Sequence, residues 1–193
     1  IETLNLDIYS ISNLMSIRLD TYDLEVNPIL NLSSNKREIA IYKKIEKVYK
    51  CLNAEAKRKN VGIYLDGKSY NLFSASNSIE IAFFIVLENA IKYSIENETI
   101  KITFKETEDR LTLTFMNWGI RPGDDEIKKL TDRNYRSRNV INRNVEEGRG
   151  IGLYLLNQIC SVNDIQLKIK LGNDNKYHNG CLLYTSDAAD EGL

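Results

Sequence analysis

The chain has 193 residues, of which 42% are hydrophobic and 27% charged, and it carries a formal net charge of −1. This composition is ordinary for a globular domain and gives no case for a surface that binds nucleic acid or a membrane. Its three cysteines lie far apart and its one histidine stands alone, which argues against a disulfide framework, a zinc site or any site that needs several histidines. We expect a cytoplasmic protein, and membrane anchoring of a longer parent protein stays open.

Two helices are predicted first. The earlier one covers about residues 5–25 and should end at Asn27-Pro28, because the residue before a proline avoids helical backbone. Its apolar face is formed by Ile8, Ile11, Met15, Leu19 and Tyr22. The later one covers about residues 36–60, where basic residues suit the helix C-terminus. Its apolar face is formed by Ile41, Ile45, Val48, Leu52 and Ala56.

Strands and helices then alternate along the chain. Period-two patterns predict strands in residues 61–67, 99–106, 111–117 and 165–171, with a hairpin between the second and third and a last strand beginning near residue 180. Helices are expected over residues 78–94, 123–131 and 150–162, and a long polar loop over 132–149. This order predicts an α+β fold, a two-layer α/β sandwich in which helices cover one face of a mixed sheet.

Both ends of the sequence look artificial. The chain begins at Ile1 rather than at a methionine. Residues 181–191, CLLYTSDAADE, resemble one reading frame of a transposon-end sequencing adapter. We therefore expect the natural chain to be cut near Gly180 and residues 181–193 to be an adapter-derived tail.

Three short stretches carry candidate chemistry. In ENAIKYS, Asn89 and Lys92 share one helix face, and an amide oxygen beside an ammonium suits a magnesium ion and its phosphates. In FMNWGIRP, Asn117 ends a strand, and its amide can both accept and donate hydrogen bonds, as an adenine edge requires. In EEGRGIGLYL, three glycines precede a helix N-terminus, which favours a bound phosphate.

Each stretch also has a plain structural interpretation. The first can be an amphipathic helix that reaches solvent, and the second a strand-ending turn. The third can be a loop that needs positive φ. For each stretch taken alone, the structural interpretation competes with the functional one. The order of the three stretches along the chain has to decide between them.

In order and type, the stretches resemble the motifs of the histidine-kinase-like ATPase family, which includes sensor kinases, gyrase, mismatch-repair and chaperone ATPases. ENAIKYS is similar to the N box, NWGI to the first glycine box, LTDRNYRS to the F box and GRGIGLYL to the second glycine box. The resemblance is closest to sensor histidine kinases and covers about residues 35–180. It implies a Bergerat-type sandwich that holds ATP and Mg²⁺ between sheet and helices.

The resemblance also implies roles for residues. Asn89 would bind the metal and Lys92 a phosphate, which makes them the candidate catalytic residues, and Tyr93 would pack near the nucleotide. Asn117 would meet the adenine, and Gly119 would give the base access to the backbone. The phosphates would rest on Gly148, Gly150, Ile151, Gly152 and Leu153.

Residues 132–149 would form a lid over the nucleotide. One or two of its arginines, with Arg136 among them, would place positive charge over the triphosphate. The candidates are Arg133, Arg136, Arg138, Arg143 and Arg149.

The N-terminal residues 1–30 resemble the end of a dimerisation hairpin and its linker. The phosphate-accepting histidine of such kinases would then lie upstream of Ile1 or on a partner. The implied partners are ATP, that histidine-bearing helix, a response regulator and a second copy of the chain, but not nucleic acid. We interpret His178 as a surface residue.

The sequence departs from the family in ways that leave three functions open. The family's aspartate is replaced by Asn117, Arg121-Pro122 stands where a second glycine is usual, and Ile85 stands where ATP-hydrolysing relatives carry a glutamate base. The chain can therefore be a kinase catalytic domain that transfers the γ-phosphate of ATP. It can also be a degenerate module that binds ATP without phosphotransfer, or a domain for protein interaction alone.

Overall fold

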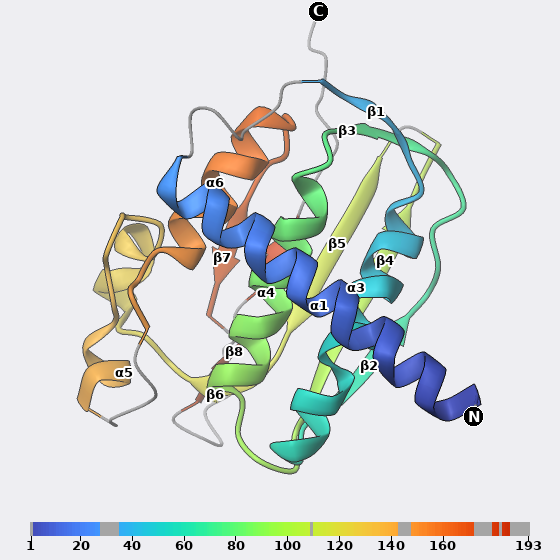
Figure 1. The fold of residues 1–193 in the computed structure, drawn as a ribbon. Helices are drawn as coiled ribbons and strands as arrows, with labels where there is room; N and C mark the ends of the chain where they lie inside the picture. Colours follow the sequence, from blue (N-terminus) through green and yellow to red (C-terminus); the bar gives the residue numbers. More distant parts are fainter. Residues whose placement is uncertain are drawn as a thin grey trace, which may run out of the picture.

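The computed structural model describes residues 2–27, 35–108, 110–142, 148–171, 179–181 and 183–185 (Figure 1). Its centre is a five-stranded mixed sheet in the order β2-β4-β5-β9-β7. The β2–β4 pair is parallel and the other pairs are antiparallel. The strands are β2 (Gly62–Asp66), β4 (Thr99–Glu106), β5 (Leu111–Met116), β7 (Lys168–Lys170) and β9 (Leu183–Thr185).

Helices pack on one face of this sheet, as predicted (Figure 1). Both α3 (Ile41–Arg58) and α6 (Gly152–Val162) contact α4 (Ile79–Tyr93), which packs on β5. Ten residues of α4 are buried, as expected for a helix that is apolar on nearly every side. The predicted apolar face of α3 is buried along its whole length. The two-layer α/β sandwich is therefore confirmed.

The first helix is α1 (Glu2–Val26), which crosses the outer side of the helical layer and contacts α3 and α4 (Figure 1). It buries Ile17 and Leu24, which are 2% and 1% exposed. Its predicted apolar face points the other way: Met15 is 61% exposed and Leu19 is 64% exposed, and Ile8, Ile11 and Tyr22 are similarly open. Within the described residues, nothing covers this face. No described helix has the length and apolar character needed to cross a membrane.

Several short elements were not predicted. β1 (Arg37–Ile39) pairs with β3 (Phe73–Ala75), so the second helix begins at Ile41 and not near residue 36. β6 (Trp118–Ile120) was not predicted either, but its partner β8 (Asn179–Cys181) lies where the last strand was expected to begin. The predicted loop contains α5 (Arg138–Asn142). The predicted helix after residue 123 is the 3₁₀ helix η1 (Asp124–Lys129). Strands of three residues are too short for period-two patterning to reveal them.

Strand β9 lies inside the stretch that resembles an adapter. It pairs with β5 on one side and with β7 on the other. This pairing uses backbone groups, which every non-proline residue supplies, so three residues of any origin can complete it. The division of the chain into residues 1–30, 35–180 and 181–193 stays a prediction.

Candidate nucleotide-binding site

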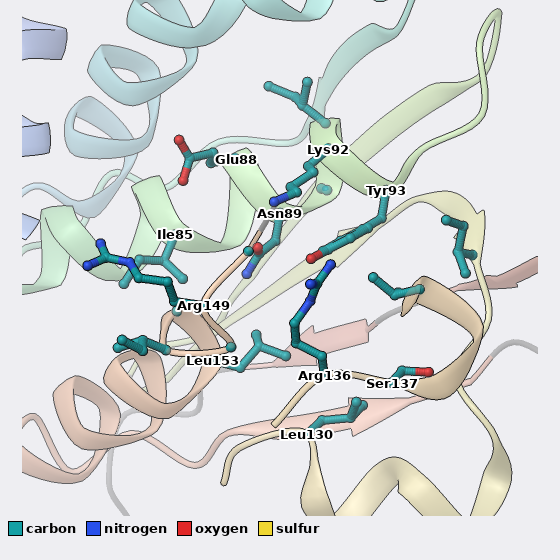
Figure 2. Close-up of a pocket in the computed structure, with 18 of the residues that line it drawn as sticks. Ile85, Glu88, Asn89, Lys92, Tyr93, Leu130, Arg136, Ser137, Arg149 and Leu153 are labelled. Atoms are coloured by element: carbon teal, nitrogen blue, oxygen red, sulfur yellow. The ribbon is translucent and has the colours of Figure 1, made fainter. Parts of the chain in front are cut away.

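A cavity of about 1020 Å³ lies between α4, the segment that follows η1, and the glycine-rich loop before α6 (Figure 2). Of the predicted site residues, Gly119 does not line it. The ten that do are Asn89, Lys92, Tyr93, Asn117, Arg136, Gly148, Gly150, Ile151, Gly152 and Leu153.

The last two turns of α4 supply the first wall. This helix is fully buried from Ala82 to Leu87 and becomes partly exposed at Glu88 and Asn89. Asn89, Lys92 and Tyr93 point into the cavity (Figure 2). Lys92 Nζ lies 5.6 Å from the centroid of the Tyr93 ring. Burial raises the pKa of Tyr93, so its hydroxyl stays protonated and available as a donor.

Glu88 has a different partner. Its carboxylate lies 2.9 Å from the guanidinium of Arg18 on α1, and it turns away from Asn89 (Figure 2). Burial raises the pKa of Glu88 while Arg18 opposes that shift. Glu88 is therefore held in an ion pair at the edge of the cavity.

The glycine-rich loop approaches α4 closely. A Cβ built on Gly148 would lie 3.0 Å from Lys92 Nζ, and one built on Gly152 would lie 3.6 Å from Asn89 Nδ2. Gly150 has φ of +68°, and its Cβ would lie 2.5 Å from the carbonyl oxygen of Tyr135. The N-terminus of α6 thus opens onto the same cavity as Asn89. If α4 and the N-terminus of α6 lay on opposite sides of the molecule, the predicted phosphate site would be contradicted.

Asn117 and Gly119 lie at the end of β5 and in β6. Asn117 is only 5% exposed and lines the cavity. Its side chain makes no hydrogen bond to another described residue. A Cβ on Gly119 would lie 2.3 Å from the Tyr93 carbonyl oxygen and 2.9 Å from Asn117 Nδ2. The lack of a Cβ at Gly119 therefore lets β6 pass close against the end of α4, and its contact with a base stays a prediction.

The structure separates the arginines of the predicted lid. Arg136 points across the cavity toward Tyr93 (Figure 2), and Arg149 lines it and pairs with Glu25 of α1. Arg133 instead lies 5.9 Å from the centroid of the Tyr154 ring, and Arg138 pairs with Asp125 at 2.7 Å. Arg143 lies outside the described residues, as does His178. The cavity therefore takes Arg136 and Arg149 from this set.

Two features of the site were missed. Helix α1 forms part of the cavity wall through Arg18, Thr21, Tyr22 and Glu25, and a one-dimensional pattern cannot show which helix a polar face will meet. The second feature is the buried carboxylate of Glu126 in η1, which accepts hydrogen bonds from Gly123, just before η1, and from the lid segment. A glutamate three residues after Gly123 has the spacing of a capping residue, which was the signal available in the sequence.

Comparison with known proteins identifies the family. Residues 75–185 match the model of the histidine kinase-, DNA gyrase B-, and HSP90-like ATPases. The signal transduction histidine-protein kinase ArlS of Staphylococcus aureus is 23% identical over 169 residues, which cover 88% of this chain and 37% of ArlS. The chain thus spans little more than a third of the length of that curated relative.

Solved structures agree on the fold. The catalytic domain of histidine kinase ThkA superposes with a TM-score of 0.65 at 16% identity, over 81% of this chain and 99% of that one. The Acinetobacter baumannii histidine kinase AdeS gives 0.65 at 16% identity, over 99% and 84%. Full-length ShkA in complex with AMPPNP gives 0.66 at 13% identity, over 89% and 36%. The chain therefore belongs to the histidine kinase-, DNA gyrase B-, and HSP90-like ATPases, with the fold of an ATP-binding histidine kinase catalytic domain.

Proposed function

We propose that this chain binds ATP and Mg²⁺ and delivers the γ-phosphate of ATP to a histidine that lies outside residues 1–193. The observation that carries the proposal is the cavity in which Asn89, Lys92 and Arg136 meet the glycine-rich loop and the first turn of α6. ATP is a polyanion with an aromatic base, and this cavity offers cations and helix N–H groups at one end and the buried Asn117 amide in the same space.

The phosphates would lie at the N-terminus of α6. The first N–H groups of an α-helix have no partner within the helix, and the helix dipole favours negative charge there. Lys92 and Arg136 add two cationic side chains from other elements. Arginine can hold two phosphate oxygens at once, whereas lysine acts as a point charge.

Asn89 fits a role as a magnesium ligand. The described residues contain no group of three His, Cys, Asp or Glu that could cage a metal ion, so water and phosphate oxygens would complete the coordination. Mg²⁺ is usually held in this way, by few protein oxygens. When bound, the ion neutralises charge that builds up between the β- and γ-phosphates.

The surroundings favour transfer to a histidine over hydrolysis. Ile85 Cγ2 would lie 3.4 Å from a Cβ at Gly152, so an apolar side chain stands one helical turn before Asn89. The nearest carboxylate in sequence, Glu88, is engaged by Arg18. Since neither Ile85 nor the paired Glu88 is placed to activate water, positioning and charge neutralisation would supply the catalysis, and the acceptor comes from elsewhere.

The partners follow from the same proposal. The acceptor is a histidine on an upstream helix or on a second chain, and a response regulator would then take the phosphoryl group. The exposed apolar face of α1 supports a homodimer. Its apolar side chains recur at helical spacing and no described residue covers them, so a helix of a second copy could pack against them. ATP is a cytoplasmic substrate, so we place the chain in the cytoplasm.

A module that binds ATP without phosphotransfer is the second candidate. It is favoured by Asn117, since an amide replaces the negative charge that the family usually places against adenine. Two measurements separate the candidates. Calorimetric titration with ATP, with and without Mg²⁺, should show magnesium-dependent binding, and its absence would contradict both.

The second measurement uses radiolabelled ATP and a longer chain that includes the upstream helix. An acid-labile, base-stable phosphoprotein is the expected product of a kinase. ATP binding without such a product would instead identify the regulatory module.

A further inference from the structure

The Glu126 carboxylate is buried beneath the lid segment and surrounded by donors. Glu126 is 2% exposed. Its Oε2 accepts from Gly123 N at 2.6 Å and from Ser137 Oγ at 3.0 Å. Its Oε1 accepts from Tyr135 Oη at 2.8 Å, from Arg138 N at 2.9 Å and from Arg138 Nε at 3.3 Å. One carboxylate thus joins η1 to three residues of the lid segment.

These three residues flank Arg136. Tyr135 and Ser137 both line the cavity and donate their hydroxyls to Glu126. The Arg136 side chain between them points into the cavity (Figure 2). The hydrogen bonds that Tyr135, Ser137 and Arg138 donate to Glu126 hold the chain on both sides of residue 136. Fixing residues 135, 137 and 138 therefore fixes the direction in which Arg136 leaves the chain.

The same segment supports the glycine-rich loop. A Cβ on Gly150 would lie 2.5 Å from the Tyr135 carbonyl oxygen. The loop therefore packs directly against the backbone of a residue that Glu126 holds. Two components of the phosphate site, the Arg136 guanidinium and the loop, thus share one anchor.

The anchor works as an ionised group. Burial by itself would raise the pKa of Glu126, but hydrogen bonds from the N–H groups of Arg138 and Gly123 and from the hydroxyls of Tyr135 and Ser137 outweigh it and lower the pKa to about 2. Each of these donors faces a carboxylate oxygen, which can only accept, so the side chain of a neutral glutamine cannot satisfy them all.

We propose that Glu126 is a positioning residue of the phosphate site, which holds Arg136 over the cavity by accepting hydrogen bonds from the residues on both sides of it. This inference rests on the proposed function, because it requires the cavity to hold a triphosphate. It assigns Glu126 no contact with the ligand; the carboxylate acts through Arg136.

The test measures dissociation constants for ATP and adenosine by calorimetry, in the wild type and in Glu126→Gln. The variant keeps the size of the side chain but presents an amide donor to groups that donate. We expect ATP affinity to fall about tenfold, the worth of a charge-assisted hydrogen bond, and adenosine affinity to change less than about twofold. Equal losses for both ligands, or no loss for ATP, would overturn the positioning role.

A double-mutant cycle with Arg136→Ala shows whether Glu126 acts through that arginine. In the Arg136→Ala background, Glu126→Gln should weaken ATP binding by less than about a further twofold. Full additivity of the two losses contradicts the proposal. The matched control is Glu80→Gln, which alters another buried carboxylate, 8% exposed and paired with Lys44 at 2.6 Å, that does not line the cavity.

A milder variant keeps the test decisive if Glu126→Gln does not fold. Tyr135→Phe removes one donor to Oε1 and should weaken ATP binding two- to threefold while sparing adenosine. An unchanged ATP affinity would count against the proposal. If the wild type binds neither ligand, the proposed function itself is contradicted. If the wild type binds ATP and the variants bind it equally well, only the role of Glu126 is contradicted.

Discussion

The guanidinium of Arg149, in the glycine-rich loop, pairs with the carboxylate of Glu25 on α1, 124 residues away in sequence. Glu25 is mostly buried, its side chain 15% exposed, and Arg149 is open at 66%. Both residues line the cavity. A carboxylate from the N-terminal helix therefore occupies an arginine that lines the proposed phosphate site.

Glu25→Gln should release Arg149 and tighten ATP binding. Because the Arg149 end of the pair is exposed, we take the value of a surface ion pair, about 0–1 kcal/mol, and expect a gain of up to about fivefold in affinity by calorimetry. Glu46→Gln is the control, since it breaks the exposed pair with Lys50 on α3 away from the cavity. Weaker ATP binding in Glu25→Gln would mean instead that Glu25 holds Arg149 in its binding position.

Asn89→Ala should abolish the magnesium-dependent part of ATP binding. The change removes the amide from the cavity wall of α4 and leaves the buried face of the helix intact. Titrations with and without Mg²⁺ measure the effect, and far-UV circular dichroism checks the fold. Asn53→Ala, in the middle of α3 and outside the cavity, is the matched control. Unchanged magnesium dependence would contradict the assignment of Asn89.

Long periodic elements could be predicted, and the contacts between them could not. The buried helix over 78–94 and the hairpin of 99–106 with 111–117 follow directly from their patterns, because each spans enough residues for a period to show. β1 and β3 pair over only three residues each. A local sequence pattern cannot predict a pairing partner that lies more than thirty residues away.

The site shows the same limit. The site residues in the N box and the second glycine box could be predicted, and line the cavity, because each motif is local. Which lid arginine enters the cavity depends on Glu126, which lies ten residues before Arg136, and the wall supplied by Glu25 depends on how α1 docks. Gly119 was assigned to the base from its motif, whereas its packing against the Tyr93 carbonyl oxygen is a tertiary contact.

Gly150→Ala should disrupt the phosphate loop more than Gly148→Ala. At Gly150 the positive φ of +68° disfavours any Cβ, and that Cβ would lie 2.5 Å from a backbone oxygen. At Gly148 the nearest atom, 3.0 Å away, is the end of the flexible Lys92 side chain. We expect Gly150→Ala to cost about 1–2 kcal/mol or more in urea unfolding and to weaken ATP binding. Equal stability of the two variants would contradict this account.

Leu19→Glu should weaken a homodimer formed through α1. Leu19 is 64% exposed on the apolar face, so a charge there leaves the packing of α1 on α3 and α4 undisturbed. Sedimentation equilibrium should show the dimer dissociation constant rising at least about tenfold, because a buried unpaired charge is costly. Ser16→Glu adds the same charge beside that face and should have little effect. A monomeric wild type, or a dimer indifferent to Leu19→Glu, would exclude α1 as the interface.

The stabilising effect of Glu126 should depend on pH in a defined direction. Its pKa is lowered from 4.5 to about 2 in the folded state, so the ionised form stabilises the fold fully above the unfolded-state pKa. That contribution decreases as pH falls from about 4.5 toward 2, because the unfolded chain takes up the proton first. Glutamine does not titrate, so the difference in unfolding free energy between wild type and Glu126→Gln should shrink across this range. Urea unfolding of both proteins at pH 6, 4 and 3 measures it, and a difference that stays constant would show that the Glu126 hydrogen bonds do not depend on its charge.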